Sequence, residues 1–237
     1  MAASLNIAHH IKALPPALKA MEAMGYDARQ CLAGTGIDPE ELLSTDLPQG
    51  FSLGQEFRFH RNLLQLSGDP LLGLKLGEAY PVQTYGLFGY AFLSAPNLRQ
   101  ALMIVSNYGP LSFTLFRIDF RETAAAGILR FSTLVDIPDD LLTFYADRDI
   151  AAALSGLEPE QFTPIRPVAV ALMHADHGRR KAYEAFFGCP ITFNSRHSEI
   201  QVDAAILDSP MPMQDAETSA ICQQQCQLLL ARMRKSS

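Results

Sequence analysis

The stretch from Phe116 to Val135 reads FRIDFRETAAAGILRFSTLV, and it decides the fold class. In its first part Phe116, Ile118 and Phe120 alternate with charged residues, which is typical of a strand with one buried and one solvent-facing side. The small residues from Ala124 to Gly127 predict a turn, and the apolar run that follows predicts a returning strand. The stretch therefore predicts an antiparallel hairpin.

The sequence before this hairpin predicts helices. Ser52 and Gln55 have the spacing of a capping box, and an apolar stripe follows them. Asp69 before Pro70 is a typical cap and first helical residue, which predicts a second, short helix. A third helix is expected to open at Pro96. The stripes that support the first and third helices are Leu53, Phe57, His60 and Leu64, and Leu98, Leu102, Val105 and Tyr108.

The sequence after the hairpin mixes helices and strands. Two acidic residues after Pro138 predict the start of a helix. The apolar segment from Val168 to Met173 predicts a strand buried on both faces. The other predicted elements are a short helix ending at Phe187, strands at 191–193 and 199–202, and a final helix at about 217–233. This order predicts an α+β fold, with a helical N-terminal half packed on a mixed or antiparallel sheet and two or more further helices.

The composition limits the classes of function. A net charge of -6 argues against a nucleic-acid surface, because duplex binding needs several Lys or Arg residues facing phosphates. No uninterrupted apolar run of about 18 residues occurs, and Met1 to His10 lacks the build of a secretory signal, which predicts a cytoplasmic protein. The scattered cysteines, Cys31, Cys189, Cys222 and Cys226, suit a reducing compartment.

Motifs for catalysis or for a resident cofactor are missing from the sequence. It has no G-x-S-x-G elbow, no phosphate-binding loop and no G-x-G-x-x-G, so we expect no catalytic residues and no cofactor, with an uncharacterised enzyme as the alternative. His174, Asp176 and His177 have ligand chemistry, but they lie where an apolar strand meets a turn, so we expect no metal site. Cys222 and Cys226, one helical turn apart, have apolar neighbours that favour packing over redox sensing.

Aromatic residues gather where the helical part meets the first strands. Large rings form rigid apolar walls, which suits a small-molecule cavity with a few polar anchors; core packing is the alternative. Arg148 lies one turn from Tyr145 on a stripe suited to burial, so it would hold an anionic ligand or, as the favoured alternative, an internal carboxylate such as Asp147 or Asp149. The candidate ligand-binding residues are Phe88, Tyr90, Tyr108, Phe116, Phe131, Tyr145 and Arg148.

The final predicted helix carries a candidate dimerisation stripe. Cys222, Cys226, Leu229 and Met233 recur at steps of four, three and four. Over so few turns a stripe that pairs with a second copy resembles a stripe that packs on its own domain. Self-association and internal packing are therefore both open.

Three segments together resemble the N-terminal effector domain of AraC/XylS-family transcription regulators. The first is GDPLLGLKLG at 68–77. The second is GLFGYA at 86–91 with SAPNLRQAL at 94–102. The third is VALMH at 170–174 with YEAFFGCPITF at 183–193. Each is weak alone, but they occur in the family's order and span nearly the whole chain.

The resemblance implies a cytoplasmic regulator whose C-terminal module inserts recognition helices into the major groove, a module that nothing in this sequence resembles. This chain would bind a small-molecule effector and form a homodimer; it would reach DNA only through the absent module and would have no membrane partner. A stand-alone small-molecule-binding protein is the alternative. We expect an effector-binding domain at 1–215, helical at about 1–110 and sheet-containing at about 111–215, and at 216–237 a C-terminal helix with the start of a linker.

Overall fold

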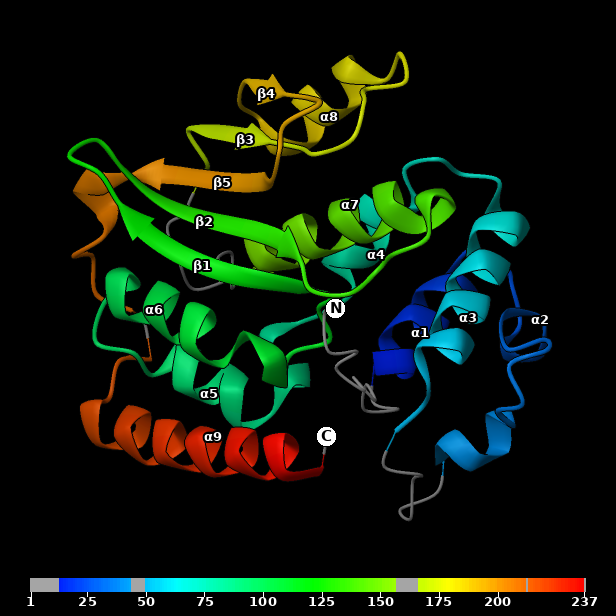
Figure 1. Ribbon diagram of the computed structural model, residues 1–237, viewed down its shortest axis with the longest axis horizontal. Coiled ribbons are helices and arrows are strands. Elements are labelled where there is room, and N and C mark those ends of the chain that lie inside the picture. The colour runs from blue at the N-terminus through cyan, green and yellow to red at the C-terminus, as the bar shows by residue number, and fades with distance from the viewer. Residues whose placement is uncertain (1–12, 44–49, 157–165, 212, 237) are drawn as a thin grey trace. The chain divides into compact units, whose positions relative to one another are not determined.

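Most of the helices and strands predicted from the sequence are present in the structure. The computed structural model describes residues 13–43, 50–156, 166–211 and 213–236, and its α+β fold confirms the predicted class (Figure 1). The helices are α1 Leu14–Ala23, α2 Ala28–Cys31, α3 Leu53–Ser67, α4 Leu72–Glu78, α5 Leu87–Leu93, α6 Leu98–Tyr108, α7 Asp139–Gly156, α8 Arg180–Phe187 and α9 Ala216–Ser236. The strands are β1 Phe116–Glu122, β2 Ala126–Thr133, β3 Ala169–Ala171, β4 Ile191–Thr192 and β5 Ser198–Asp203.

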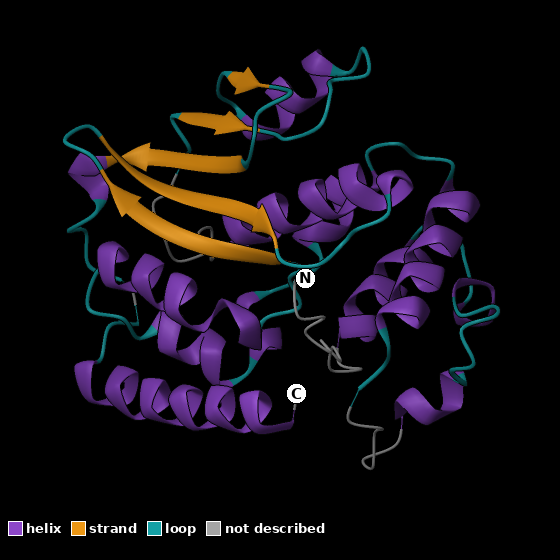
Figure 2. Cartoon of the chain, in the orientation of Figure 1, coloured by secondary structure: helices purple, strands orange, loops and turns teal. Residues whose placement is uncertain are grey.

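The chain folds into two compact units. Unit 1 consists of residues 1–80 and 138–152, and unit 2 consists of residues 81–137 and 153–237. Helices α1 to α4 and most of α7 belong to unit 1, whereas unit 2 holds all five strands with α5, α6, α8 and α9 (Figure 2). The division into units reflects packing and does not test ligand binding. The effector-binding domain expected at 1–215 and the helix with linker expected at 216–237 therefore stay a prediction.

Helix α3 of unit 1 has the predicted capping box, but a different buried face. The Ser52 hydroxyl accepts a hydrogen bond from the Gln55 backbone N–H at 3.3 Å, and the Gln55 side chain accepts one from the Ser52 N–H at 2.9 Å. The predicted stripe is wrong by about one position, because a glutamate one turn before His60 points inward. The buried residues of α3 are Glu56, Phe59, His60 and Leu63.

Helices α4 and α7 approach each other closely in unit 1. Helix α4 begins two residues later than predicted, because the Asp69 carboxylate accepts a hydrogen bond from the Leu71 N–H at 2.9 Å and closes a turn. A Cβ atom at Gly77 would lie 2.4 Å from the Cβ of Ala151 and 2.5 Å from the carbonyl oxygen of Arg148. Only glycine fits at this contact, which fixes where α7 crosses α4.

The sheet of unit 2 is mixed and has the order β1-β2-β5-β3-β4. Neighbouring strands are antiparallel except for β3 and β4, which are parallel. The predicted hairpin forms, with Phe116 opposite Thr133. The prediction that Val168 to Met173 is buried on both faces is wrong, because Val168 is 47 % exposed and only Val170 of strand β3 is buried.

Three helices of unit 2 stack on one side of the sheet. Helix α6 packs against β1 and β2, α5 packs against α6, and α9 packs against α5 (Figure 1). Helix α5, which begins after Gly86 at a φ of 57°, was not predicted from the sequence. Phe88 and Phe92 lie one turn apart on its buried side. A Cβ atom at Gly89 would lie 2.1 Å from the carbonyl oxygen of Val82, so this helix also depends on a close approach.

Candidate functional site

Unit 1 contains a group of buried polar side chains between α3 and α7, which we call the polar cluster. Its members are Glu56 and His60 of α3 and Tyr145, Arg148 and Asp149 of α7. Their exposed fractions are 1 %, 3 %, 0 %, 4 % and 7 % in that order. Charged groups this deeply buried are stable only when they are paired.

Arg148 is the centre of the polar cluster. Its Nε and Nη2 atoms lie 2.7 and 2.6 Å from one carboxylate oxygen of Asp149, and its Nη1 atom lies 3.9 Å from Glu56 Oε1. The guanidinium carbon also lies 4.8 Å from the centre of the Tyr145 ring. Burial acts to lower the pKa of Arg148, but Asp149 and the other acidic neighbours outweigh it, so the pKa is raised. Arg148 thus has the internal carboxylate partner that the sequence favoured.

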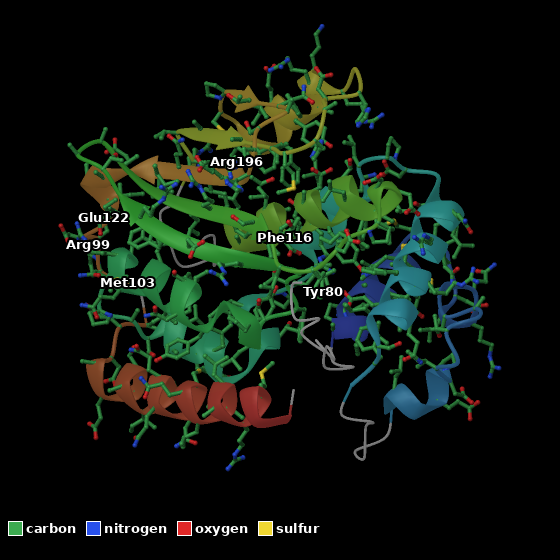
Figure 3. The ribbon with its side chains drawn as sticks, viewed as in Figure 1. Tyr80, Arg99, Met103, Phe116, Glu122 and Arg196 are labelled. Atoms are coloured by element: carbon green, nitrogen blue, oxygen red, sulfur yellow. The ribbon has the colours of Figure 1, made fainter. Side chains whose placement is uncertain are left out.

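His60 extends the polar cluster on the α3 side. Its Nδ1 atom is hydrogen-bonded to the Tyr145 hydroxyl at 2.7 Å, which ties α3 to α7. Burial raises the pKa of Tyr145 well above its ordinary value, and the charge of Glu56 raises it further. Tyr80, which follows α4 (Figure 3), donates a hydrogen bond to the carbonyl oxygen of Ala13 at 2.8 Å, and burial raises its pKa to about 12.

The arrangement of the polar cluster would allow one carboxylate partner of Arg148 to be replaced by another. Two carboxylates share one guanidinium, and Glu56 sits at the longer distance of 3.9 Å. A carboxylate from a small molecule would meet the same cation and would compete with these internal partners. Sequence reasoning missed Glu56, although its spacing of one turn from His60 on a helix that buries His60 was a usable signal.

The aromatic candidate residues do not all meet in one place. Phe88, Tyr108, Phe116 and Phe131 are buried in unit 2, whereas Tyr145 lies with Arg148 in unit 1. Tyr90 does not lie on the buried face of α5: it is 49 % exposed, because it lies about half a turn from Phe88 around the helix. The structure therefore brings together Tyr145 and Arg148, and separately the buried rings of unit 2.

The candidate dimerisation stripe on α9 is divided between core and surface. Cys222 and Cys226 are buried, with exposed fractions of 8 % and 0 %, and burial raises the pKa of Cys226 to about 11. Leu229 and Met233 are 37 % and 40 % exposed. The exposed side of α9 also carries Ile221 and Leu228, and from residue 218 to 231 the helix has no charged residue. Self-association through α9 stays a prediction.

The residues with metal-ligand chemistry have local structural partners. His174 Nδ1 donates a hydrogen bond to the carbonyl oxygen of Ala175 at 2.8 Å, and its ring packs beside Tyr183. The Asp176 carboxylate accepts a hydrogen bond from the Gly178 N–H at 3.1 Å. Among the residues that the structure describes, no three His, Cys, Asp or Glu side chains are grouped so that they could hold a metal ion. Within the same ranges, no helix is long and apolar enough to cross a membrane.

Comparison with known proteins identifies the family. The model of the N-terminal arabinose-binding domain of AraC transcription regulators matches residues 25–211. The HTH-type transcriptional regulators Mb1430 of Mycobacterium bovis and Rv1395 of Mycobacterium tuberculosis are 26% identical over 237 residues, which cover 96% of this chain and 67% of each relative. The ornithine utilization regulator of Pseudomonas aeruginosa is 25% identical over 169 residues, covering 71% of this chain and 49% of that protein.

A solved structure agrees with this fold. The crystal structure of the transcriptional regulator CdpR from Pseudomonas aeruginosa matches with a TM-score of 0.65 at 18% identity, and the match covers 89% of this chain and 61% of CdpR. The chain thus spans about two thirds of the length of the mycobacterial relatives and less of the two Pseudomonas proteins. The protein belongs to the family of N-terminal arabinose-binding domains of AraC transcription regulators.

Proposed function

We propose that this chain is the effector-sensing part of an AraC-type transcription regulator that acts in the cytoplasm. Its effector would be a small metabolite with a carboxylate, anchored by Arg148. The observation that carries the proposal is a buried guanidinium whose two carboxylate partners come from the protein itself, at 2.6 and 3.9 Å. One relative is named as a regulator of ornithine utilization, and ornithine carries a carboxylate, which supports this ligand class.

The polar cluster would convert binding into a change of structure. If an effector carboxylate takes the place of Glu56 on Arg148, the cation stays paired, but a buried link between α3 and α7 is lost. A ligand shifts an equilibrium only by its differential affinity for two states, and this exchange supplies such a difference. In the whole regulator the shift would alter the DNA-binding part, which makes the contacts to DNA.

A thermal-shift screen of carboxylate metabolites tests the proposal. A ligand at about 100 times its dissociation constant stabilises the fold by about 2.7 kcal/mol, which is readily measured. For the ligand found, Arg148→Ala should weaken binding by roughly 2 to 5 kcal/mol, the scale for removing one partner of a buried charge pair. Arg148→Lys keeps the charge but loses the bidentate geometry, so it serves if the alanine variant unfolds. Unchanged affinity in either folded variant contradicts the anchor role.

We propose separately that the buried rings of unit 2 line an apolar ligand cavity within that unit. Phe88, Tyr108, Phe116 and Phe131 are buried in unit 2, and their rings would form its apolar walls. Apolar surface removed from water contributes about 25 cal/mol per Å², so loss of one ring should weaken an apolar ligand measurably. Phe131→Leu keeps the core filled and is expected to change effector affinity, which calorimetry of the folded variant measures.

We also propose that the chain forms a homodimer through the exposed side of α9. Ile221, Leu228 and Leu229 are 54 %, 50 % and 37 % exposed on a helix whose central turns carry no charge. Charged residues are depleted at the centres of protein interfaces, and the uncharged surface of α9 fits that composition. The buried Cys222 and Cys226 would support the helix from within unit 2 rather than contact the partner.

A further inference from the structure

Strands β1, β2 and β5 leave one polar face of the sheet of unit 2 with exposed side chains. Phe116 and Ile118 lie on the opposite, buried face, where Ile118 lies against Gly109 beyond α6. The residues between and after them, Arg117, Asp119 and Arg121, therefore point to the polar face. The strand register arranges the side chains of this face in rows: Arg117 with Ser132; Asp119 with Arg130 and Glu199; and Arg121 with Ile128 and Gln201.

Charges in the second and third rows compensate one another. Arg130 Nε lies 2.6 Å from Glu199 Oε1, and Arg121 Nη2 lies 3.6 Å from the same oxygen. Asp119 lies directly opposite Arg130 in the strand register. Two guanidinium groups thus stand beside two carboxylates, so these rows have no net charge.

The first row differs because its positive charge is not compensated. Arg117 is exposed and forms no ion pair with another residue that the structure describes. Opposite it, Ser132 Oγ lies 3.2 Å from His197 Nδ1, which continues the row toward β5. Arg196 precedes His197, is exposed beside β5 (Figure 3), and likewise has no ion-pair partner within the described ranges. Positive charge, a hydroxyl and an imidazole therefore share one end of the polar face.

We propose that Arg117, Ser132 and His197 form a binding site for one anionic group, a carboxylate or a phosphate, of a small molecule. A guanidinium pairs with such a group in bidentate geometry, and the hydrogen-bonded pair of Ser132 and His197 adds at least one further donor. Because the uncompensated charge is confined to one row, the site has the size of a single anionic group. An extended acidic protein surface would need complementary charge on all three rows. The site lies in unit 2, so it is additional to the effector site proposed at Arg148.

NMR titration of the 15N-labelled chain tests the site. Sodium phosphate and sodium acetate are added in separate series at an ionic strength held constant with sodium chloride, and the amide signals of Arg117, Ser132 and His197 are followed. We expect shifts that saturate in at least one series, and the two series identify the preferred anion. Arg117→Ala should raise the dissociation constant at least about tenfold, or about 1.4 kcal/mol. Arg121→Ala, which removes the same charge from the compensated rows, should raise it much less than Arg117→Ala does.

Three results would overturn the site. Shifts that rise without saturation, or that weaken equally in both variants, would mean general charge screening of the face. Saturable binding of a tetraglutamate peptide without binding of phosphate or acetate would indicate a protein-docking surface instead. The effector proposal is tested by the Arg148 variants in unit 1, whereas this site is tested by the Arg117 variant in unit 2. Failure of one proposal therefore leaves the other standing.

Discussion

Unit 1 and unit 2 bury different kinds of side chain. Unit 1 encloses Glu56, His60, Arg148 and Asp149 between two helices, whereas the sheet of unit 2 covers an apolar face and keeps its arginines on the other. Buried apolar groups stabilise one arrangement over all others, but a buried ion pair is close to balance between desolvation and attraction. Under the proposed function, unit 1 would supply the exchangeable contacts that sensing needs, and unit 2 would supply the rigid core that supports a dimer surface.

Removal of the central cation should be the strongest test of this contrast. Arg148→Ala removes the cation beside two buried carboxylates, so it should lower the free energy of unfolding by about 3 to 5 kcal/mol. Arg61 and Asp140 form a matched control, because this ion pair of 2.6 Å also joins α3 to α7 but is exposed. Arg61→Ala should cost about 0 to 1 kcal/mol. Urea unfolding measures both, and equal losses would contradict the special role of the polar cluster.

The close approach of α4 to α7 gives the next largest effect. Gly77→Ala places a Cβ atom against the backbone of α7, so it should destabilise the fold by about 1 to 3 kcal/mol. Gly54 is the control, since a Cβ atom there would meet nothing nearer than 3.9 Å. Gly54→Ala should be neutral or stabilising, because alanine is favoured in helices. Thermal unfolding of both variants compares them; a harmless Gly77→Ala would mean that α7 moves freely on α4.

The dimer proposed through α9 of unit 2 is tested by a substitution that should change stability less than the two above. Leu229→Asp adds a charge to the exposed side of α9, so it should convert a dimer into a monomer while the unfolding free energy changes by about 0.5 kcal/mol or less. Sedimentation analysis gives the mass and circular dichroism gives the fold. Cys226→Asp, on the buried side of the same helix, should unfold unit 2 instead. Global unfolding by Leu229→Asp would assign that position to the core.

Alkaline pH should weaken both units. Burial raises the pKa of Cys31 in unit 1 and of Cys226 in unit 2 to about 11 from an ordinary value of 9.0. Because the folded pKa lies above the unfolded one, the stability from each protonated thiol is complete below about pH 9 and is lost as the pH rises toward 11. Unfolding curves at pH 8 and pH 10 should therefore differ less in Cys226→Ala than in the unchanged chain.

Local signals predicted the parts of the fold that depend on neighbouring residues. The hairpin follows from the alternation around Ile118, and the start of α3 follows from Ser52 and Gln55. Helix α5 was missed because it is short and its aromatic residues, Phe88, Tyr90 and Phe92, alternate at a spacing of two, which is typical of a strand. The burial of the segment around strand β3 was misjudged because the exposure of an apolar residue such as Val168 depends on which strands pair beside it.

The candidate site was predicted only in part for a related reason. Arg148 and its internal partner Asp149 are neighbours in sequence, so burial of the one suggested the other. Glu56 comes from a helix far along the chain, and its place beside Arg148 depends on how α3 packs on α7. The sequence alone does not show whether a glutamate on a helix faces the core or the solvent, because the residues that pack against it are not known.

The central claim is that Glu56 competes with the effector for Arg148, and the effector affinity of Glu56→Gln tests it most directly. Glutamine keeps the shape of the side chain but removes the competing charge, so an anionic effector should bind roughly tenfold more tightly, or about 1.4 kcal/mol. Calorimetry on the folded variant and the unchanged chain gives the ratio. Equal or weaker binding by Glu56→Gln would contradict the account, because the internal carboxylate would then not be what the effector displaces.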